Sequence, residues 1–199
     1  MHPKTVTLEE FAIVNLALEA EVRERHLLED RLAEVQARAD AARHASLHDP
    51  LTGLPNRALF GDRLAQGLAH ARRHHRTLAV LFFDLDDFKP VNDTWGHEVG
   101  DQVLCQVAGR LEAATRTEDT VCRYGGDEFL SLLNELESPH VVPGIVDKLR
   151  QLVAEPLEVG LVTLSMQVSI GAALFPRDGS TATELIESAD RAMYAVKRR

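Results

Sequence analysis

Cysteine and positive charge are both scarce in this sequence of 199 residues. The two cysteines, Cys105 and Cys122, form no Cys-x-x-Cys pair, which argues against a disulfide framework or a zinc site and suits a reducing cytoplasm. The formal net charge is −9. General nucleic-acid binders and proteins that bind anionic membranes need a basic field, so neither nucleic acid nor a membrane surface is an expected partner.

Long apolar runs are also missing. None approaches the roughly 20 residues of a membrane-spanning helix. The N-terminus shows no signal-peptide pattern, because Glu9 and Glu10 interrupt it. We therefore expect a cytoplasmic protein with no membrane segment in this chain, consisting of one domain and an extension.

Glycine and proline are absent from residues 7 to about 46, which are rich in Ala, Leu, Glu and Arg. These are good helix formers, so the stretch predicts one long helix. Its apolar residues recur every three or four positions in two frames that disagree near Arg25, which makes an interrupted heptad pattern. We favour a parallel coiled coil that forms a homodimer over a helix that folds back on its own domain. The apolar positions are Leu8, Phe11, Leu18 and Val22, then Leu28, Leu32, Val35, Ala39 and Ala42.

Two prolines and a glycine between Ser46 and Arg57 end this helix and begin a new element. Leu51 and Leu54 are apolar, which indicates a segment that docks on the following domain instead of a free linker. Asn56 is placed to cap a helix that runs to about residue 75.

An acidic cluster follows a buried strand. Residues 77–83 are almost all apolar, which is typical of a strand covered on both faces. Residues 84–89 then read Asp-Leu-Asp-Asp-Phe-Lys, and such a cluster is costly unless a cation meets it. Magnesium is the natural partner for hard oxygen ligands. A calcium EF-hand is excluded, because its sixth position would be Lys89 instead of Gly and its twelfth Trp95 instead of Glu.

A second acidic pair lies at a predicted hairpin. Apolar stretches flank Gly125-Gly126, and glycine takes the positive φ angles of tight turns without penalty. Asp127 and Glu128 follow at once, where glycines also let a ligand approach the backbone closely. Taken alone, the motif fits a solvated hairpin tip equally well.

Residues 90–101 are predicted to form a polar loop, followed by a helix. Asn92 and Asp101 are the kind of amide and carboxylate pair that can bind a guanine edge, although each could also be a local cap. His97 alone would more often be a structural hydrogen-bonding residue.

Taken together and in order, these motifs resemble the GGDEF-domain diguanylate cyclases, over about residues 47–197. The matching motifs are Asp49-Pro50-Leu51-Thr52-Gly53-Leu54-Pro55-Asn56-Arg57, Asp84-x-Asp86-x-Phe88-Lys89, Asn92-Asp93, Gly96-His97, Gly100-Asp101, Arg123-Tyr124-Gly125-Gly126-Asp127-Glu128-Phe129, Ser169-Ile170-Gly171-Ala172 and Ala189-Asp190-x-Ala192-Met193-Tyr194.

The resemblance implies an α+β fold with a central mixed, mainly antiparallel sheet flanked by helices, related to nucleotidyl cyclases and polymerase palms. With the long N-terminal helix in front, we expect a signalling coiled-coil helix over residues 1–46 and a GGDEF catalytic domain over 47–199. The implied reaction condenses two GTP into cyclic di-GMP, a bacterial signal, with release of pyrophosphate, and it needs Mg²⁺ or Mn²⁺.

The resemblance also implies residue roles. Asp84, the backbone carbonyl of Leu85 and Asp127 would hold the metal, with Asp127 also accepting the proton and Glu128 as a second essential carboxylate. Lys89 and Lys197 would stabilise phosphate charge, the backbone N–H groups of Asp87 and Phe88 would cradle phosphates, and Asn92, His97 and Asp101 would hold guanine and ribose. The family usually adds a Gly-Arg-Asn a few residues later, so Arg198 or Arg199 would have to supply the second phosphate-binding arginine here.

Arg116 and Asp119 stand where the family often carries an inhibitory Arg-x-x-Asp site for cyclic di-GMP. The plain alternative is a surface Arg–Asp pair. Because one domain holds one GTP, a homodimer through the N-terminal helix would raise the effective concentration of the second half-site. Two other functions stay open: an inactive module that binds GTP or cyclic di-GMP, and a structural dimerisation module.

Overall fold

The computed structural model describes the backbone of residues 8–198 and the side chains of residues 11–13 and 15–198. The chain divides into two compact units that meet between Ser46 and Leu47. Residues 1–7 and Arg199, and with them the expected role of Leu8 in the apolar pattern, lie outside the described backbone or side chains.

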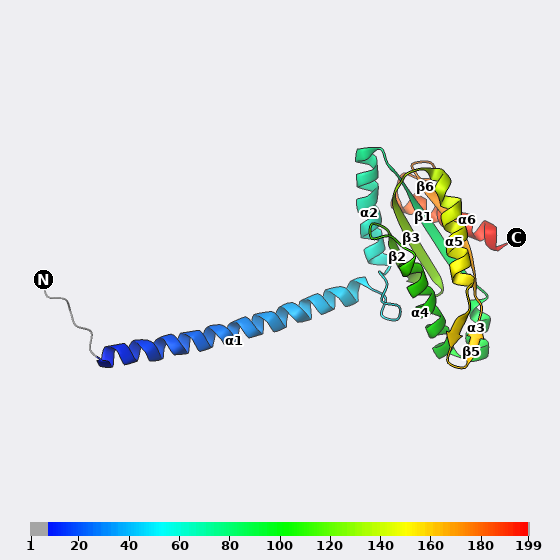
Figure 1. The fold of residues 1–199 in the computed structure, drawn as a ribbon. Coiled ribbons are helices and arrows are strands. Elements are labelled where there is room, and N and C mark those ends of the chain that lie inside the picture. The colour runs from blue at the N-terminus through cyan, green and yellow to red at the C-terminus, as the bar shows by residue number, and fades with distance from the viewer. Residues whose placement is uncertain (1–7, 199) are drawn as a thin grey trace. The chain divides into compact units, whose positions relative to one another are not determined.

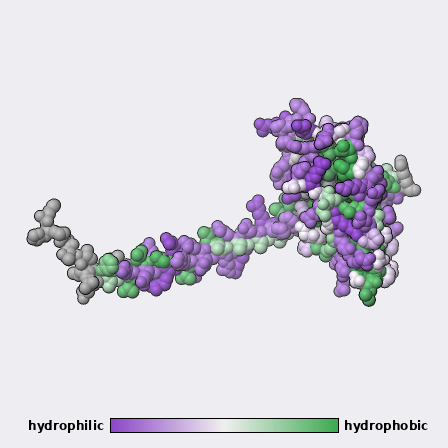
Figure 2. Space-filling model, viewed as in Figure 1, coloured by the Kyte–Doolittle hydropathy of each residue, from purple (hydrophilic) through white to green (hydrophobic). Residues whose placement is uncertain are grey.

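The first unit is the predicted long helix, α1 (Leu8–Leu47). Its surface carries polar side chains with apolar ones among them (Figure 2), and the apolar ones are strongly exposed, with Leu28 and Leu32 each at 57%. An ion pair one turn apart, Arg38 to Glu34 at 2.6 Å, adds local helical support. The other exposed apolar side chains are Phe11, Ile13, Leu16, Leu18, Leu27 and Val35.

The second unit is an α+β domain (Figure 1), which confirms the predicted fold class. Its main sheet has the strand order β2-β3-β1-β6, and all three pairings are antiparallel. In chain order the elements are α2 (Arg57–His74), β1 (Thr77–Asp86), α3 (Phe88–Trp95), α4 (His97–Ala113), β2 (Thr120–Gly125), β3 (Glu128–Leu136), the short 3₁₀ helix η1 (Pro139–Val141), α5 (Val142–Ala154), β4 (Leu157–Val159), β5 (Val162–Leu164), β6 (Gln167–Phe175) and α6 (Ala182–Lys197).

Strand β1 runs through the middle of the sheet and is covered on both faces, as its apolar run predicts. Leu81 and Phe83 belong to the core that includes α4 and α5, whereas Val80 and Phe82 belong to the core that includes α2 and α6. Side chains alternate between the faces of a strand, so a continuous apolar run supplies two cores at once.

Local signals at helix and hairpin ends also hold. Asn56 caps α2, where its side chain accepts hydrogen bonds from the N–H groups of Ala58 at 2.9 Å and Leu59 at 3.1 Å. Gly160 has φ +61° in the turn between β4 and β5, a two-stranded hairpin apart from the main sheet.

The prediction of a polar loop over residues 90–101 is wrong. Residues 88–95 form the helix α3, and α4 begins already at His97. Pro90 lies in the first turn of α3, where its missing N–H has no intrahelical partner to lose. Gly96, with φ +84°, separates the two helices. Among residues 8–198, no helix is long and apolar enough to span a bilayer.

Candidate active site

The predicted acidic groups meet at one end of the central strands. Asp84 on β1 lies opposite Glu128 on β3, and the Leu85 N–H donates to the carbonyl of Asp127 at 3.3 Å. The two motifs are far apart in the sequence, and antiparallel pairing of β1 with β3 brings them together. Asp84, Leu85, Asp127 and Glu128 are therefore neighbours.

Helix α6 adds a cation to this group. The Lys197 ammonium donates a hydrogen bond to Asp84 Oδ1 and forms an ion pair with it. Burial alone would lower the pKa of Lys197, but its hydrogen bond to Asp84 and the charges of Asp84, Asp86 and Asp127 raise it overall. Lys197 is therefore held in its charged form beside the carboxylates.

The position of α6 depends on a glycine in β6. A Cβ atom at Gly171 would lie 2.1 Å from both the Ala189 carbonyl oxygen and the Met193 nitrogen. Both contacts are with helix backbone, which cannot rotate away as a flexible side chain can. Only glycine lets α6 approach the sheet this closely, and α6 carries Lys197 near its end.

Negative charge accumulates around Glu128. Burial raises the pKa of this carboxyl first, and the charges of Asp84, Asp127 and Asp190 raise it further, while Lys197 opposes them. Asp190 comes from α6, and sequence reasoning assigned it no role. Negative charge therefore exceeds positive charge at the end of the sheet that carries Asp84 and Glu128.

Ser169 is a second residue that sequence reasoning gave no role at the site. This buried hydroxyl on β6 donates to Asp86 Oδ1 at 2.8 Å. Ser169 also lies opposite Asp84 in the β1–β6 pairing. It fixes the Asp86 carboxylate next to the predicted metal ligands.

The donor set fits a hard divalent cation. Asp84, Asp127 and the Leu85 carbonyl offer only oxygen ligands, and Mg²⁺ is commonly held by one or two carboxylates while substrate phosphates and waters complete its shell. Within the described part of the chain, no group of three or more His, Cys, Asp or Glu side chains is arranged as a complete metal site. The residues therefore suit a cation that is shared with a phosphate ligand.

The other predicted substrate contacts lie on α3 and α4, directly after β1. Asp87, with φ +56°, is the residue before α3, and Phe88 is its first residue and is buried. Their N–H groups belong to the helix start, where backbone donors have no intrahelical acceptor. Lys89 on α3 is exposed.

Asn92 on α3 packs against the start of α4. A Cβ at Gly100 would lie 1.9 Å from Asn92 Oδ1, so glycine at this position makes room for the amide. His97 and Asp101 are exposed on the first turns of α4. Asn92 thus lies beside Gly100, the residue that precedes Asp101.

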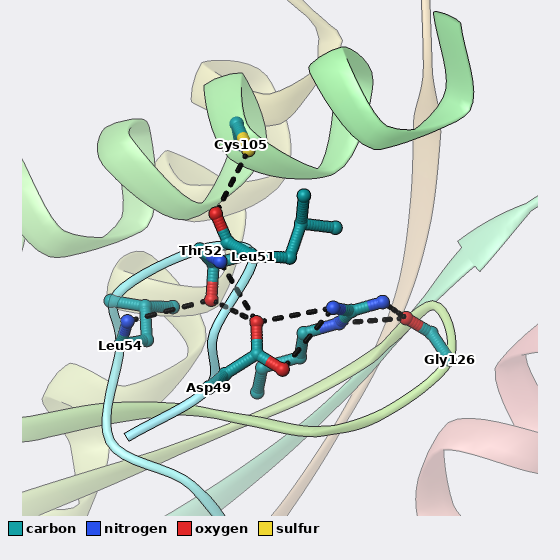
Figure 3. Close-up of polar contacts among 7 residues, drawn as sticks. Asp49, Leu51, Thr52, Leu54, Cys105 and Gly126 are labelled. Carbon is teal, nitrogen blue, oxygen red and sulfur yellow. Dashed lines mark hydrogen bonds and ion pairs between the residues drawn. The ribbon is translucent and has the colours of Figure 1, made fainter. Parts of the chain in front are cut away.

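Sequence reasoning missed a network that holds the hairpin (Figure 3). The Arg123 guanidinium donates to Asp49 Oδ1 at 3.1 Å and Oδ2 at 3.2 Å, and to the Gly126 carbonyl at 3.0 and 2.8 Å. Burial alone would raise the pKa of Asp49, but hydrogen bonds from Thr52 and Arg123 lower it overall. The signal in the sequence is Asp49-Pro50-Leu51-Thr52, whose role the linear pattern does not reveal.

The predicted inhibitory residues lie in the loop between α4 and β2. The Asp119 carboxylate accepts a hydrogen bond from the Asn134 N–H at 2.8 Å. Burial raises the pKa of Asp119 and the charge of Glu118 raises it further, whereas the Asn134 bond and the Arg116 charge oppose this. A cavity of about 120 Å³ adjoins Arg116 and Asp119 and is lined also by Lys148.

Comparison with known proteins identifies the family. The family model described as "Diguanylate cyclase, GGDEF domain" matches residues 46–199. This chain belongs to the GGDEF family. It is 47% identical over 152 residues to the bifunctional diguanylate cyclase/cyclic di-GMP phosphodiesterase MucR of Pseudomonas aeruginosa, covering 76% of this chain and 22% of MucR.

Two further GGDEF proteins extend the likeness. The diguanylate cyclase TpbB of Pseudomonas aeruginosa is 41% identical over 86% of this chain and 40% of TpbB. The crystal structure of the coiled coil and GGDEF domain of DgcB from Caulobacter crescentus, in complex with cyclic di-GMP, has a TM-score of 0.79 at 32% identity, covering 92% of this chain and 95% of that one.

The relatives of this chain are named for different activities. The cyclic di-GMP phosphodiesterase NbdA of Pseudomonas aeruginosa is 39% identical over 88% of this chain and 23% of NbdA. This chain thus spans 22 to 40% of the length of MucR, TpbB and NbdA. Membership alone therefore does not establish turnover.

Proposed function

We propose that this chain is a diguanylate cyclase that condenses two GTP into cyclic di-GMP and releases pyrophosphate. The observation that carries the proposal is the meeting of Asp84, Asp127 and Glu128 at one end of the sheet, with Lys197 paired to Asp84. The substrate places the working enzyme in the cytoplasm.

The reaction is attack of a ribose 3′-hydroxyl on an α-phosphate. Asp84, the Leu85 carbonyl and Asp127 would hold Mg²⁺ or Mn²⁺, which when bound supplies positive charge to the phosphates. Asp127 accepts the hydroxyl proton, and Glu128 is the second essential carboxylate. Alignment of the two reacting groups accounts for much of the rate, since little covalent chemistry falls to the protein.

The nucleotide is bound by the remaining predicted residues. Lys89 and Lys197 stabilise phosphate charge, and the N–H groups of Asp87 and Phe88 at the start of α3 donate to phosphate oxygens. Asn92, His97 and Asp101 hold guanine and ribose. Lys197, which contacts Asp84 here, would contact a phosphate of the bound nucleotide.

A homodimer formed through α1 supplies the second GTP-bound domain that the reaction needs. One domain holds one GTP, so a second domain must face it. The exposed apolar side chains of α1 give a second copy a surface to bury, as a parallel coiled coil does. The DgcB structure, which comprises a coiled coil and a GGDEF domain, supports this assignment.

Cyclic di-GMP also acts as an inhibitor in this proposal. An arginine fork at Arg116 can grip a guanine edge or a phosphate with two hydrogen bonds, and Asp119 can accept from guanine N–H groups. Both residues lie in the loop between α4 and β2, away from the acidic group. Inhibition would therefore not compete with GTP.

The test is product analysis after incubation of the full chain with GTP and Mg²⁺. We expect cyclic di-GMP and pyrophosphate, with none formed when the cation is chelated. Asp84→Ala and Asp127→Ala should each lower turnover on the order of 10³-fold, or about 4 kcal/mol of transition-state stabilisation.

Two controls make the result specific. Asp147→Asn removes an exposed carboxylate on α5 that pairs with nearby Arg150, and it should leave turnover unchanged. Circular dichroism should show that Asp84→Ala is folded. Full activity in a folded Asp84→Ala protein would overturn the site, and GTP binding without product would identify an inactive binding module.

A further inference from the structure

Residues 49–54, which follow α1, form a turn that is held by internal hydrogen bonds and packs on the domain. The Asp49 N–H donates to the Leu54 carbonyl at 2.8 Å, and Thr52 donates to Asp49 Oδ1 from both its N–H and its hydroxyl at 2.8 Å. Leu54 is 1% exposed and belongs to the core with α4. Cys105 on α4 donates to the Leu51 carbonyl at 3.3 Å (Figure 3), so the turn is anchored at several points.

This anchored turn reaches the hairpin at three points. Asp49 binds the Arg123 side chain, and the Pro55 carbonyl accepts from the Arg123 N–H at 3.1 Å. The Arg57 guanidinium lies 4.6 Å from the centre of the Tyr124 ring, a cation–π distance. Arg123 and Tyr124 directly precede Gly125-Gly126, so the turn braces the strand that leads into the hairpin.

The Asp49–Arg123 pair is shielded from solvent, which separates it from the surface pairs of this chain. The side chain of Arg123 is 14% exposed and that of Asp49 is 18% exposed. The Arg150–Asp147 pair on α5 has similar chemistry at 2.8 Å, but its side chains are 38% and 65% exposed. Exposed pairs contribute little because water screens them, whereas a shielded, doubly bonded pair holds its geometry.

The same Arg123 side chain also donates two hydrogen bonds to the carbonyl of Gly126. Gly126 has φ +55°, and its carbonyl forms the peptide bond with Asp127. Two donors on one carbonyl oxygen restrict rotation of that peptide plane, and the plane sets the direction in which Asp127 leaves the turn. The Asp127 carbonyl in turn accepts from the Leu85 N–H next to Asp84.

We propose that Asp49 and Arg123 are positioning residues that hold the Gly126 peptide, and through it Asp127 and Glu128, in the geometry that the reaction requires. The proposal rests on the proposed diguanylate cyclase function. Neither residue is among the predicted substrate contacts. Asp49 follows the end of α1 by two residues.

The test uses the full chain and compares Asp49→Asn, Arg123→Lys and the double variant with wild type. Asparagine keeps one oxygen for Thr52, but it removes the charge and replaces the second oxygen that accepts from Arg123 with an NH2 group. Lysine keeps the charge and loses the fork that spans Asp49 and Gly126. We expect kcat for cyclic di-GMP formation to fall about tenfold in each single variant, about 1.4 kcal/mol. The dissociation constant for GTP in Mg²⁺ should stay within about twofold, because the predicted nucleotide contacts are untouched.

The double variant tests whether the two residues act as one unit. If Asp49 works through Arg123, the double variant should be no slower than the slower single variant, instead of showing the roughly hundredfold loss of independent effects. Asp147→Asn on the exposed pair is the matched control and should leave kcat unchanged.

Hydrogen exchange gives a readout that does not need turnover. A loosened hairpin should speed exchange of the Leu85 amide, which donates to Asp127, at least about tenfold in Asp49→Asn. The Leu81 amide in the middle of β1 should be unchanged. If wild type makes no product, the proposed function fails, while the exchange result still decides the positioning role.

Three outcomes overturn the proposal. The first is a kcat for folded Asp49→Asn within about twofold of wild type. The second is unchanged exchange at Leu85. The third is a loss of activity that matches the fraction unfolded at the assay temperature, because this would leave the pair with a structural role only.

Discussion

The two units of this chain treat their apolar side chains in opposite ways. In the domain, Phe83 and Phe129 are 1% and 0% exposed, whereas Leu28 and Leu32 on α1 are each 57% exposed. The domain therefore holds its fold with its own cores. The long helix has the apolar surface but not the partner, because single helices gain most of their stability from packing.

This difference suggests separate roles, with dimerisation assigned to α1 and the reaction to the domain. The carboxylates, Lys197 and the Asp49–Arg123 pair all belong to the domain. In the proposed reaction, one chain supplies one half-site and a second copy supplies the other. Protein concentration should thus control turnover through α1, without altering the fold of the domain.

Among the changes that test this comparison, replacement of the apolar side chains of α1 should have the largest effect. Leu28→Glu with Leu32→Glu should lower the rate per chain about 100-fold at nanomolar protein, because it removes the effective concentration that a linked dimer provides. The rate should recover as protein concentration rises, and removal of residues 1–46 should act in the same way. Initial rates over a protein dilution series, with sedimentation of the same samples, measure both.

A control variant shows whether the effect depends on the apolar positions of α1. Gln36→Glu adds a charge at an exposed polar position of α1 and should leave both dimerisation and rate unchanged. Equal activity of the double variant and wild type at nanomolar protein would show that α1 has another purpose, and the contrast between the two units would lose its functional meaning.

A smaller effect is expected at the inhibitory loop of the domain. Arg116→Ala should raise the cyclic di-GMP concentration needed for half inhibition about tenfold or more, since a charged, two-bond contact is lost. Initial rates with added product test this, and Arg150→Ala serves as an exposed arginine control on α5. Equal sensitivity of wild type and Arg116→Ala would leave Arg116 and Asp119 as surface charges.

The smallest effect concerns the stability of the domain itself. The folded-state pKa of Glu128 is raised above its ordinary value of 4.5, so the folded domain binds this proton more tightly than the unfolded chain does. The ionised carboxylate therefore costs stability above the folded pKa, and this cost disappears as pH falls towards 4.5. Glu128→Gln should remove it.

We expect Glu128→Gln to melt higher than wild type at pH 7, on the order of 1–3 °C, while losing turnover. At pH near 4.5 the two melting temperatures should converge. Exposed Glu137→Gln is the matched control and should show no gain. A lower melting temperature for Glu128→Gln at pH 7 would contradict the crowding of negative charge around this carboxylate.

Much of the domain could be predicted from the sequence because its signals are local. The apolar run of β1, the Gly125-Gly126 turn and the Asn56 cap each act through a few neighbouring residues. Once β1 and β3 pair, Asp84 and Glu128 must be neighbours. The helix α3 was missed because it is short and polar and contains Pro90, which reads as a loop.

The remaining features depend on contacts between distant segments. Asp49 and Arg123 are 74 positions apart, and no periodic pattern joins them. Asp190 and Ser169 likewise reach the acidic group only because α6 and β6 pack beside β1. Linear reasoning could identify the carboxylates but not the residues that hold and surround them.

Gly171 shows what this means for genetics. It carries no reactive group, yet α6 rests on it and brings Lys197 to Asp84. A random screen for loss of cyclic di-GMP should recover changes at this glycine beside those at the carboxylates, while a search limited to chemically reactive residues would pass over it. Gly171→Ala, which adds one methyl group in the middle of β6, should therefore have an effect similar to removal of the Lys197 side chain.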